Sequence, residues 1–153
     1  MYNKKIYDVN IAIDRLKNYC AVQDRCQWDV IRKMKEWRLT QNTQDHILEL
    51  LISNQYINEE RFAISFCQGK FRIKKWGKNK IKNELKKRDI SKNCIIKGLD
   101  SIDEDQYQEI LKKIIEQKTD KSKEKNPFIK KNKIAKYLIQ KGFENNLIWD
   151  ILR

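Results

Sequence analysis

The sequence has 153 residues, of which 36% are charged, and its formal net charge is +13. Four glycines and one proline argue against an all-β fold, which needs frequent turn residues. Stretches rich in Lys, Glu, Ile and Leu favour helices instead.

The positive charge is unevenly distributed along the chain. Residues 1–69 hold ten basic and nine acidic residues, whereas residues 70–97 hold 12 basic residues against two acids. Residues 112–141 hold 11 basic residues against three acids. Such a charge distribution favours a polyanionic partner, with nucleic acid as the first candidate. The alternative is a general lysine bias from an AT-rich genome, which the near-neutral first part weakens but does not remove.

The residue types that support catalysis or metal binding are sparse. The four cysteines form no C-x-x-C pair, and the single histidine, His46, is distant from them in sequence, so a zinc site is not expected. The glycines are scattered, and the acids 103–105 have the position of a helix start, where capping explains them. We therefore expect a non-enzymatic protein without a cofactor, and a metal-dependent nuclease remains a weak alternative. The cysteines suit a reduced, cytoplasmic protein, and neither a signal peptide nor a membrane span is expected.

A hydrophobic pattern occurs three times, with apolar residues at spacings of four and five. The three instances are Val30, Met34 and Leu39; Ile81, Leu85 and Ile90; and Ile134, Leu138 and Phe143. A second small or apolar pair follows eight and nine residues after each instance, at 47–48, 98–99 and 151–152. Repeats about 45–55 residues apart indicate tandem helical units. The sequence predicts an all-α fold of three-helix repeats, three in number with the last one truncated, in an elongated curved array.

In chain order, helical periodicity at 9–20 predicts a leading helix within the segment 1–25. The predicted first repeat, 26–74, contains helices at 27–37, 43–54 and 59–73. The predicted second repeat, 75–117, contains helices at 78–88, 92–100 and 104–117. A segment without apolar residues, 118–126, is expected to be a charged linker or a helix extension. The third repeat, 127–153, is expected to have only two helices, at 128–141 and 144–152.

The most basic segment, residues 70–80, joins the predicted first and second repeats. Six basic residues surround Phe71 and Trp76. Basic residues interleaved with aromatic ones suit phosphate contact and stacking. The alternative is that the aromatic residues are buried and the lysines are merely solvated.

The chain resembles the RecX family of bacterial regulatory proteins that act on RecA. The resemblance rests on Tyr56-Ile-Asn-Glu-Glu-Arg-Phe-Ala63, on Lys75-Trp-Gly77 followed by Ile81 and Glu84-Leu85, and on Leu138-Ile-Gln-Lys-Gly-Phe143. These motifs and the triple repeat extend from about residue 12 to residue 153. The resemblance implies binding in the groove of the RecA–DNA filament, with inhibition of ATP hydrolysis, strand exchange and coprotease activity during recombination, DNA repair and the SOS response.

For the contact residues we select basic and aromatic positions in the matching region. The candidates are Arg61, Lys70, Arg72, Lys74, Lys75, Trp76, Lys78 and Lys80. The expected partners are the RecA filament and, weakly through electrostatics, single- and double-stranded DNA. Self-repulsion of the basic chain favours a monomer. The alternative function is that of a stand-alone DNA-binding protein that needs no RecA.

Overall fold

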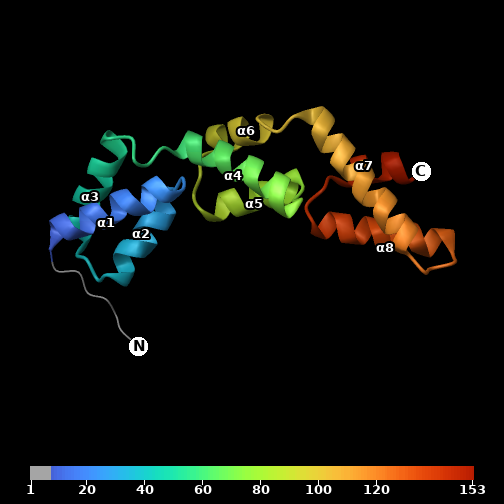
Figure 1. Cartoon of the computed structure of the whole chain (residues 1–153), viewed down its shortest axis with the longest axis horizontal. Coiled ribbons are helices and arrows are strands. Elements are labelled where there is room, and N and C mark those ends of the chain that lie inside the picture. The colour runs from blue at the N-terminus through green and yellow to red at the C-terminus, as the bar shows by residue number, and fades with distance from the viewer. Residues whose placement is uncertain (1–7) are drawn as a thin grey trace.

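The computed structural model describes residues 8–153 and forms an elongated row of helices, with no strand in that range (Figure 1). The predicted leading segment begins at residue 1, and residues 1–7 lie outside the described part of the chain. The helices are α1 (Val9–Val22), α2 (Gln27–Glu36), α3 (Gln41–Ser53), α4 (Glu59–Lys74), α5 (Lys78–Lys87), α6 (Lys92–Asp100), α7 (Glu104–Lys121), α8 (Pro127–Gln140) and α9 (Asn145–Leu152). Each predicted helix is present, with its ends shifted by a few residues at most. The all-α repeat prediction is confirmed.

The repeated hydrophobic pattern marks the ends of α2, α5 and α8. Each of these helices is followed by a residue with positive φ: Arg38 (56°), Asp89 (55°) and Gly142 (98°). The next residue is apolar, and its N–H donates to the carbonyl five residues earlier, in the pairs Leu39–Met34 (3.3 Å), Ile90–Leu85 (3.2 Å) and Phe143–Leu138 (3.0 Å). This is the Schellman arrangement, which brings the two apolar residues together. The spacings of four and five therefore record one helical turn followed by one helix-terminating turn.

The first three helices enclose a core of their own. Its fully buried members include Leu16 of α1, Val30 and Met34 of α2, and Ile47 and Leu51 of α3. The spacing of four within α2 and within α3 places these residues on one face of each helix. Helices α1–α3 thus form a first three-helix unit.

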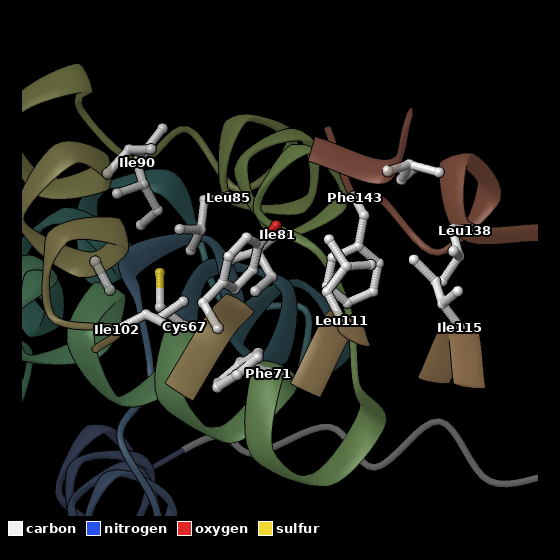
Figure 2. Packing of buried hydrophobic residues seen from close by; sticks show 14 of the residues in the cluster. Cys67, Phe71, Ile81, Leu85, Ile90, Ile102, Leu111, Ile115, Leu138 and Phe143 are labelled. Carbon is white, nitrogen blue, oxygen red and sulfur yellow. The ribbon is translucent and has the colours of Figure 1, made fainter. Parts of the chain in front are cut away.

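The remaining six helices share a second core (Figure 2). Within it, α4 packs against α5 and α6, whereas α7 packs against α8 and α9. Figure 2 shows Cys67 and Phe71 of α4, Ile81 and Leu85 of α5, and Phe143 beside α8 in this one cluster. The second and third units are α4–α6 and α7–α9, joined by a common core.

The boundaries of the three units are shifted by one helix from those of the predicted repeats. The predicted ranges 26–74 and 75–117 begin one helix later than α1–α3 and α4–α6, so α7 stands in the third unit and gives it three helices. The repeated pattern lies on the second helix of each unit. Its spacing does not indicate whether a unit begins with the helix before it or with that helix itself. Of the predicted linker 118–126, the part up to Lys121 continues α7 and the rest connects it to α8.

Candidate nucleic-acid interface

The basic segment forms the turn between α4 and α5. Helix α4 ends at Lys74 and is capped by Lys75, whose φ of 57° is left-handed and whose N–H donates to the carbonyl of Phe71 (3.1 Å). The N–H of Trp76 bonds to the carbonyl of Lys70 (3.2 Å), and Gly77 precedes α5 as its N-cap. This local hydrogen bonding reverses the chain and places the lysines of both helices around one turn.

The turn between α8 and α9 supports this turn through backbone contacts. The N–H of Gly77 donates to the carbonyl of Lys141 (2.8 Å), and the N–H of Asn79 donates to that of Gly142 (2.9 Å). A Cβ atom on Gly77 would lie 2.3 Å from the carbonyl carbon of Gly142, and one on Gly142 would lie 2.3 Å from the Cβ of Lys80. Glycine is needed at both positions because the two backbones touch.

Five lysines lie at or beside the paired turns, and two of them contact the half-buried Trp76. The Nζ atoms of Lys70 and Lys80 lie 5.1 and 4.5 Å from the centre of the Trp76 ring. Lys141 donates from Nζ to the carbonyl of Lys74 (3.1 Å). We call this group the turn cluster: Lys70, Lys74, Lys75, Lys80 and Lys141. The tryptophan orients two ammonium groups through cation–π contact, and the cluster as a whole can bind phosphates or carboxylates.

Arg61 lies far from the turn cluster. It precedes Lys74 by 13 positions on α4, which corresponds to about 20 Å of helix. Its Nε bonds to Oδ1 of Asp24 (2.7 Å), and its Nη2 bonds to the carbonyls of Gln55 (3.0 Å) and Tyr56 (3.3 Å). The guanidinium therefore ties the first unit to the start of α4, and the side chain is still 44% exposed.

Lys78 is also occupied by neighbours within the protein. Its Nζ bonds to Oε2 of Glu104 (2.9 Å) and lies 4.7 Å from the ring centre of Tyr107. The hydrogen bond from Lys78 lowers the pKa of the Glu104 carboxyl below its usual value. Lys78 thus links α5 to α7 and adds less free positive charge to the surface than the turn cluster does.

Tyr107 fills the space beneath the paired turns. Its side chain is fully buried, with its ring 5.5 Å from that of Phe71 and 5.4 Å from that of Phe143. Its hydroxyl accepts from the backbone N–H of Lys78 (2.9 Å) and donates to the carboxylate of Glu144. Burial is the main cause, and the bond to Glu144 the second, that raises the pKa of Tyr107 far above its ordinary value. This neutral hydroxyl joins α5, α7 and the start of α9 below the lysines.

Two further basic residues lie near the turn cluster or in it: Arg72, which was a predicted contact, and Lys141, which was not. Arg72 is exposed on α4, where its Nη2 makes a long contact of 3.5 Å with Oε1 of Gln68. Lys141 was not among the predicted contacts because it follows Lys74 by 67 positions. Its only signal in the sequence is its place directly before Gly142 in the third hydrophobic pattern.

The rest of the described chain offers few chemically reactive groups. Residues 8–153 contain no group of three His, Cys, Asp or Glu side chains placed to hold a metal ion. Burial raises the pKa of the Cys26 and Cys67 thiols to about 12, which keeps both protonated at neutral pH. Within the same range no helix is both long and apolar enough to cross a bilayer.

Two RecX family models match the second and third units. The model described as "RecX, second three-helix domain" matches residues 58–99, and "RecX, third three-helix domain" matches residues 104–152. These ranges correspond to α4–α6 and α7–α9 to within one residue, the same grouping that the helix contacts give. The third unit, predicted from the sequence to have two helices, accordingly includes α7.

Curated relatives and solved structures point to the same family. The chain is 24% identical over 136 residues to the regulatory protein RecX of Limosilactobacillus reuteri, covering 89% of this chain and 52% of that protein. It is 33% identical over 104 residues to RecX of Clostridium tetani, covering 66% and 47%. The chain thus spans about half the length of these relatives. A crystal structure of RecX from Lactobacillus salivarius, 23% identical, covers 94% of both chains with a TM-score of 0.83 and has the same fold. This chain belongs to the RecX family.

Proposed function

We propose that this protein binds the RecA–DNA filament and regulates it, mainly by inhibiting ATP hydrolysis, strand exchange and coprotease activity in recombination and DNA repair. The observation that carries the proposal is the match of α4–α9 to two consecutive RecX domains. The relatives with the same domains are named regulatory proteins. In this proposal the protein acts in the cytoplasm, as a monomer and without catalysis of its own.

The turn cluster gives the proposal a physical basis. A filament presents DNA phosphates beside protein, and each phosphate that a lysine neutralises releases counterions, which favours binding at low salt. Lys74 and Lys75 are exposed, and Lys80 is held over Trp76. The Lys75 ammonium donates to the carbonyl of Arg72 (2.8 Å), a neutral group that leaves its charge available to a polyanion. Contact with DNA through five lysines alone is weak and depends on salt, and the remaining affinity comes from the RecA protein. Occupying the groove would then hinder entry of a second DNA strand.

The first experiment measures ATP hydrolysis by the cognate RecA on single-stranded DNA, titrated with this protein at physiological salt. We expect inhibition at fewer than one molecule of this protein per RecA protomer, including when the filament is assembled beforehand. If hydrolysis falls only when the protein coats free DNA and preassembled filaments are unaffected, the protein is a stand-alone DNA-binding protein.

A charge variant assigns the effect to the turn cluster. The triple substitution Lys74→Gln, Lys75→Gln and Lys80→Gln removes three charges from the paired turns. The matched control is Lys35→Gln, Lys86→Gln and Lys92→Gln, which removes three charges from exposed positions outside the turn cluster. We expect the first variant to need about tenfold more protein for half-inhibition, because each lost phosphate contact weakens binding several-fold. Equal loss in both variants would mean that only net charge matters.

A further inference from the structure

A groove of about 250 Å³ lies between the end of α1 and the exposed side of α4. Gln23 and Asp24 form the wall on the first unit, and Phe66, Gly69 and Ile73 lie along α4. Ile73 is 79% exposed and forms an apolar strip in the groove with Phe62 and Phe66, whereas the other lining side chains are polar or charged. The groove therefore contains an apolar strip that no described part of the chain covers.

Gly69 differs from the other three glycines of the chain in its surroundings. Gly77 and Gly142 lie back to back, and a Cβ on Gly98 would lie 2.7 Å from the carbonyl oxygen of Ala63. Each of these three glycines lets two parts of the protein touch. Gly69 is in the interior of α4, and a Cβ atom there would meet nothing within 4 Å.

Glycine inside a helix destabilises it relative to alanine, so its presence needs a cause. No contact within the described residues supplies one at position 69, because the space beside it is open. An absent side chain at this point deepens the groove and lets an external backbone approach α4 closely. The glycine is thus accounted for by a partner that rests in the groove.

The pattern along α4 indicates what kind of partner fits. Phe66, Gly69 and Ile73 are spaced by three and four residues and form one helical stripe. Lys70 and Lys74 border this stripe in the groove, which favours acidic residues at the edge of the partner. The apolar side chains of Phe66 and Ile73 offer no hydrogen bond to a nucleic-acid phosphate, and the carboxylate of Asp24 on the opposite wall is already paired with Arg61.

We propose that this groove binds an amphipathic α-helix of the protein component of the filament, with its apolar face on Phe66, Gly69 and Ile73. Acidic residues of that helix approach Lys70 and Lys74. This inference rests on the proposed function and adds to it a protein-binding surface that adjoins the phosphate contacts and shares Lys70 and Lys74 with them. Lys70 lies between the two surfaces, since its Nζ is 5.4 Å from the ring centre of Phe66 and 5.1 Å from that of Trp76.

The test is Gly69→Leu, which fills the groove without disturbing the fold. The substitution replaces a helix-interior glycine beside open space, so we expect Tm to rise by about 2–5 °C. The matched control is Asn83→Leu, which adds a leucine at an exposed position within α5. Binding of labelled protein to preassembled RecA filaments is measured by fluorescence anisotropy, beside binding to naked single-stranded DNA and sedimentation of the protein alone.

The proposal expects Gly69→Leu to weaken filament binding at least tenfold, with DNA binding and Asn83→Leu unchanged. Equal filament affinity of Gly69→Leu and the wild type overturns the groove and leaves the proposed function intact. A wild-type protein that does not bind filaments overturns the proposed function itself. An equal loss of DNA binding assigns the groove to nucleic acid, and loss of a wild-type dimer assigns it to a second copy of the chain; either result overturns the proposal.

Discussion

The two junctions between the three-helix units are built differently. The first unit meets the second through the partly exposed pair Arg61–Asp24, with side-chain exposures of 44% and 26%, and through packing of Cys26 and Trp28. The second unit meets the third through the fully buried Tyr107 and through direct backbone hydrogen bonds at Gly77. The first unit keeps a core of its own, whereas the other two share one.

The two proposed surfaces lie at different junctions, although they share Lys70 and Lys74. The turn cluster lies over the second junction, where backbone contacts fix the lysines of α4, α5 and α8 in one arrangement. The groove lies at the first junction, where one wall belongs to the first unit and the other to α4. A partner that fills the groove would add contacts to the junction that has the fewer internal ones.

The largest effect is expected at the second junction from Gly77→Ala. The new Cβ would lie 2.3 Å from the backbone of Gly142, which cannot move aside as a side chain can. We expect the free energy of unfolding to fall by about 2–3 kcal/mol, measured by urea denaturation. Gly69→Ala is the control, and it should raise the stability by about 0.5–1 kcal/mol because the space there is open. Equal effects at both positions would contradict the tight backbone contact.

The next effect is expected from Tyr107→Phe, which removes one oxygen from the same junction. The backbone N–H of Lys78 and the carboxylate of Glu144 would each lose a hydrogen bond in a partly buried place. We expect a loss of about 1–2 kcal/mol in urea denaturation. Tyr137→Phe, on a half-buried tyrosine of the same unit, is the control and should change stability little.

A smaller effect is expected at the first junction. Arg61→Gln breaks the bond to Asp24 in a solvent-accessible setting, so the expected cost is about 0.5 kcal/mol. A double-mutant cycle with Asp24→Asn measures the coupling of the two side chains. A coupling above that of the Tyr107 network would reverse the order of the two junctions.

The smallest effect is a pH dependence at Glu59, the first residue of α4. Its Oε2 is buried without a hydrogen-bond partner, and burial raises the pKa of the carboxyl. A raised pKa in the folded state means that Glu59 favours folding below its unfolded pKa and loses this contribution as pH rises through the folded pKa. Glu59→Gln should therefore be at least as stable as the wild type at neutral pH, and this advantage should vanish near pH 4. Urea midpoints at the two pH values give the difference, and a variant that is less stable at neutral pH would show that the charge helps.

The helices could be predicted from the sequence because their signals are local. One turn of α2 separates Val30 from Met34, and the hydrogen bond that ends the helix joins Leu39 to Met34. The spacing of these residues alone therefore identifies a helix end. The boundaries of the units could not be predicted in this way. Whether α4 packs against α3 or against α5 depends on tertiary contacts that the spacing does not contain.

The site was predictable only in part, for a related reason. The lysines of 70–80 follow from composition, but the neutralisation of Lys78 depends on Glu104, which lies 26 residues later. Lys141 joins the cluster from a different unit through a contact across 67 residues. The charge pattern identifies a candidate surface, whereas only the tertiary structure distinguishes lysines that pair with a carboxylate from those that do not.

The backbone bonds at Gly77 have a consequence for the order of folding. The turns that end α2, α5 and α8 are closed by residues five apart and can form as soon as each is synthesised. The N–H groups of Gly77 and Asn79 instead donate to the carbonyls of Lys141 and Gly142, which are synthesised more than 60 residues later. On the ribosome, the first unit can complete its own core while the second still lacks these partners. The lysine-bearing turn would then take its final shape only when the third unit emerges and docks.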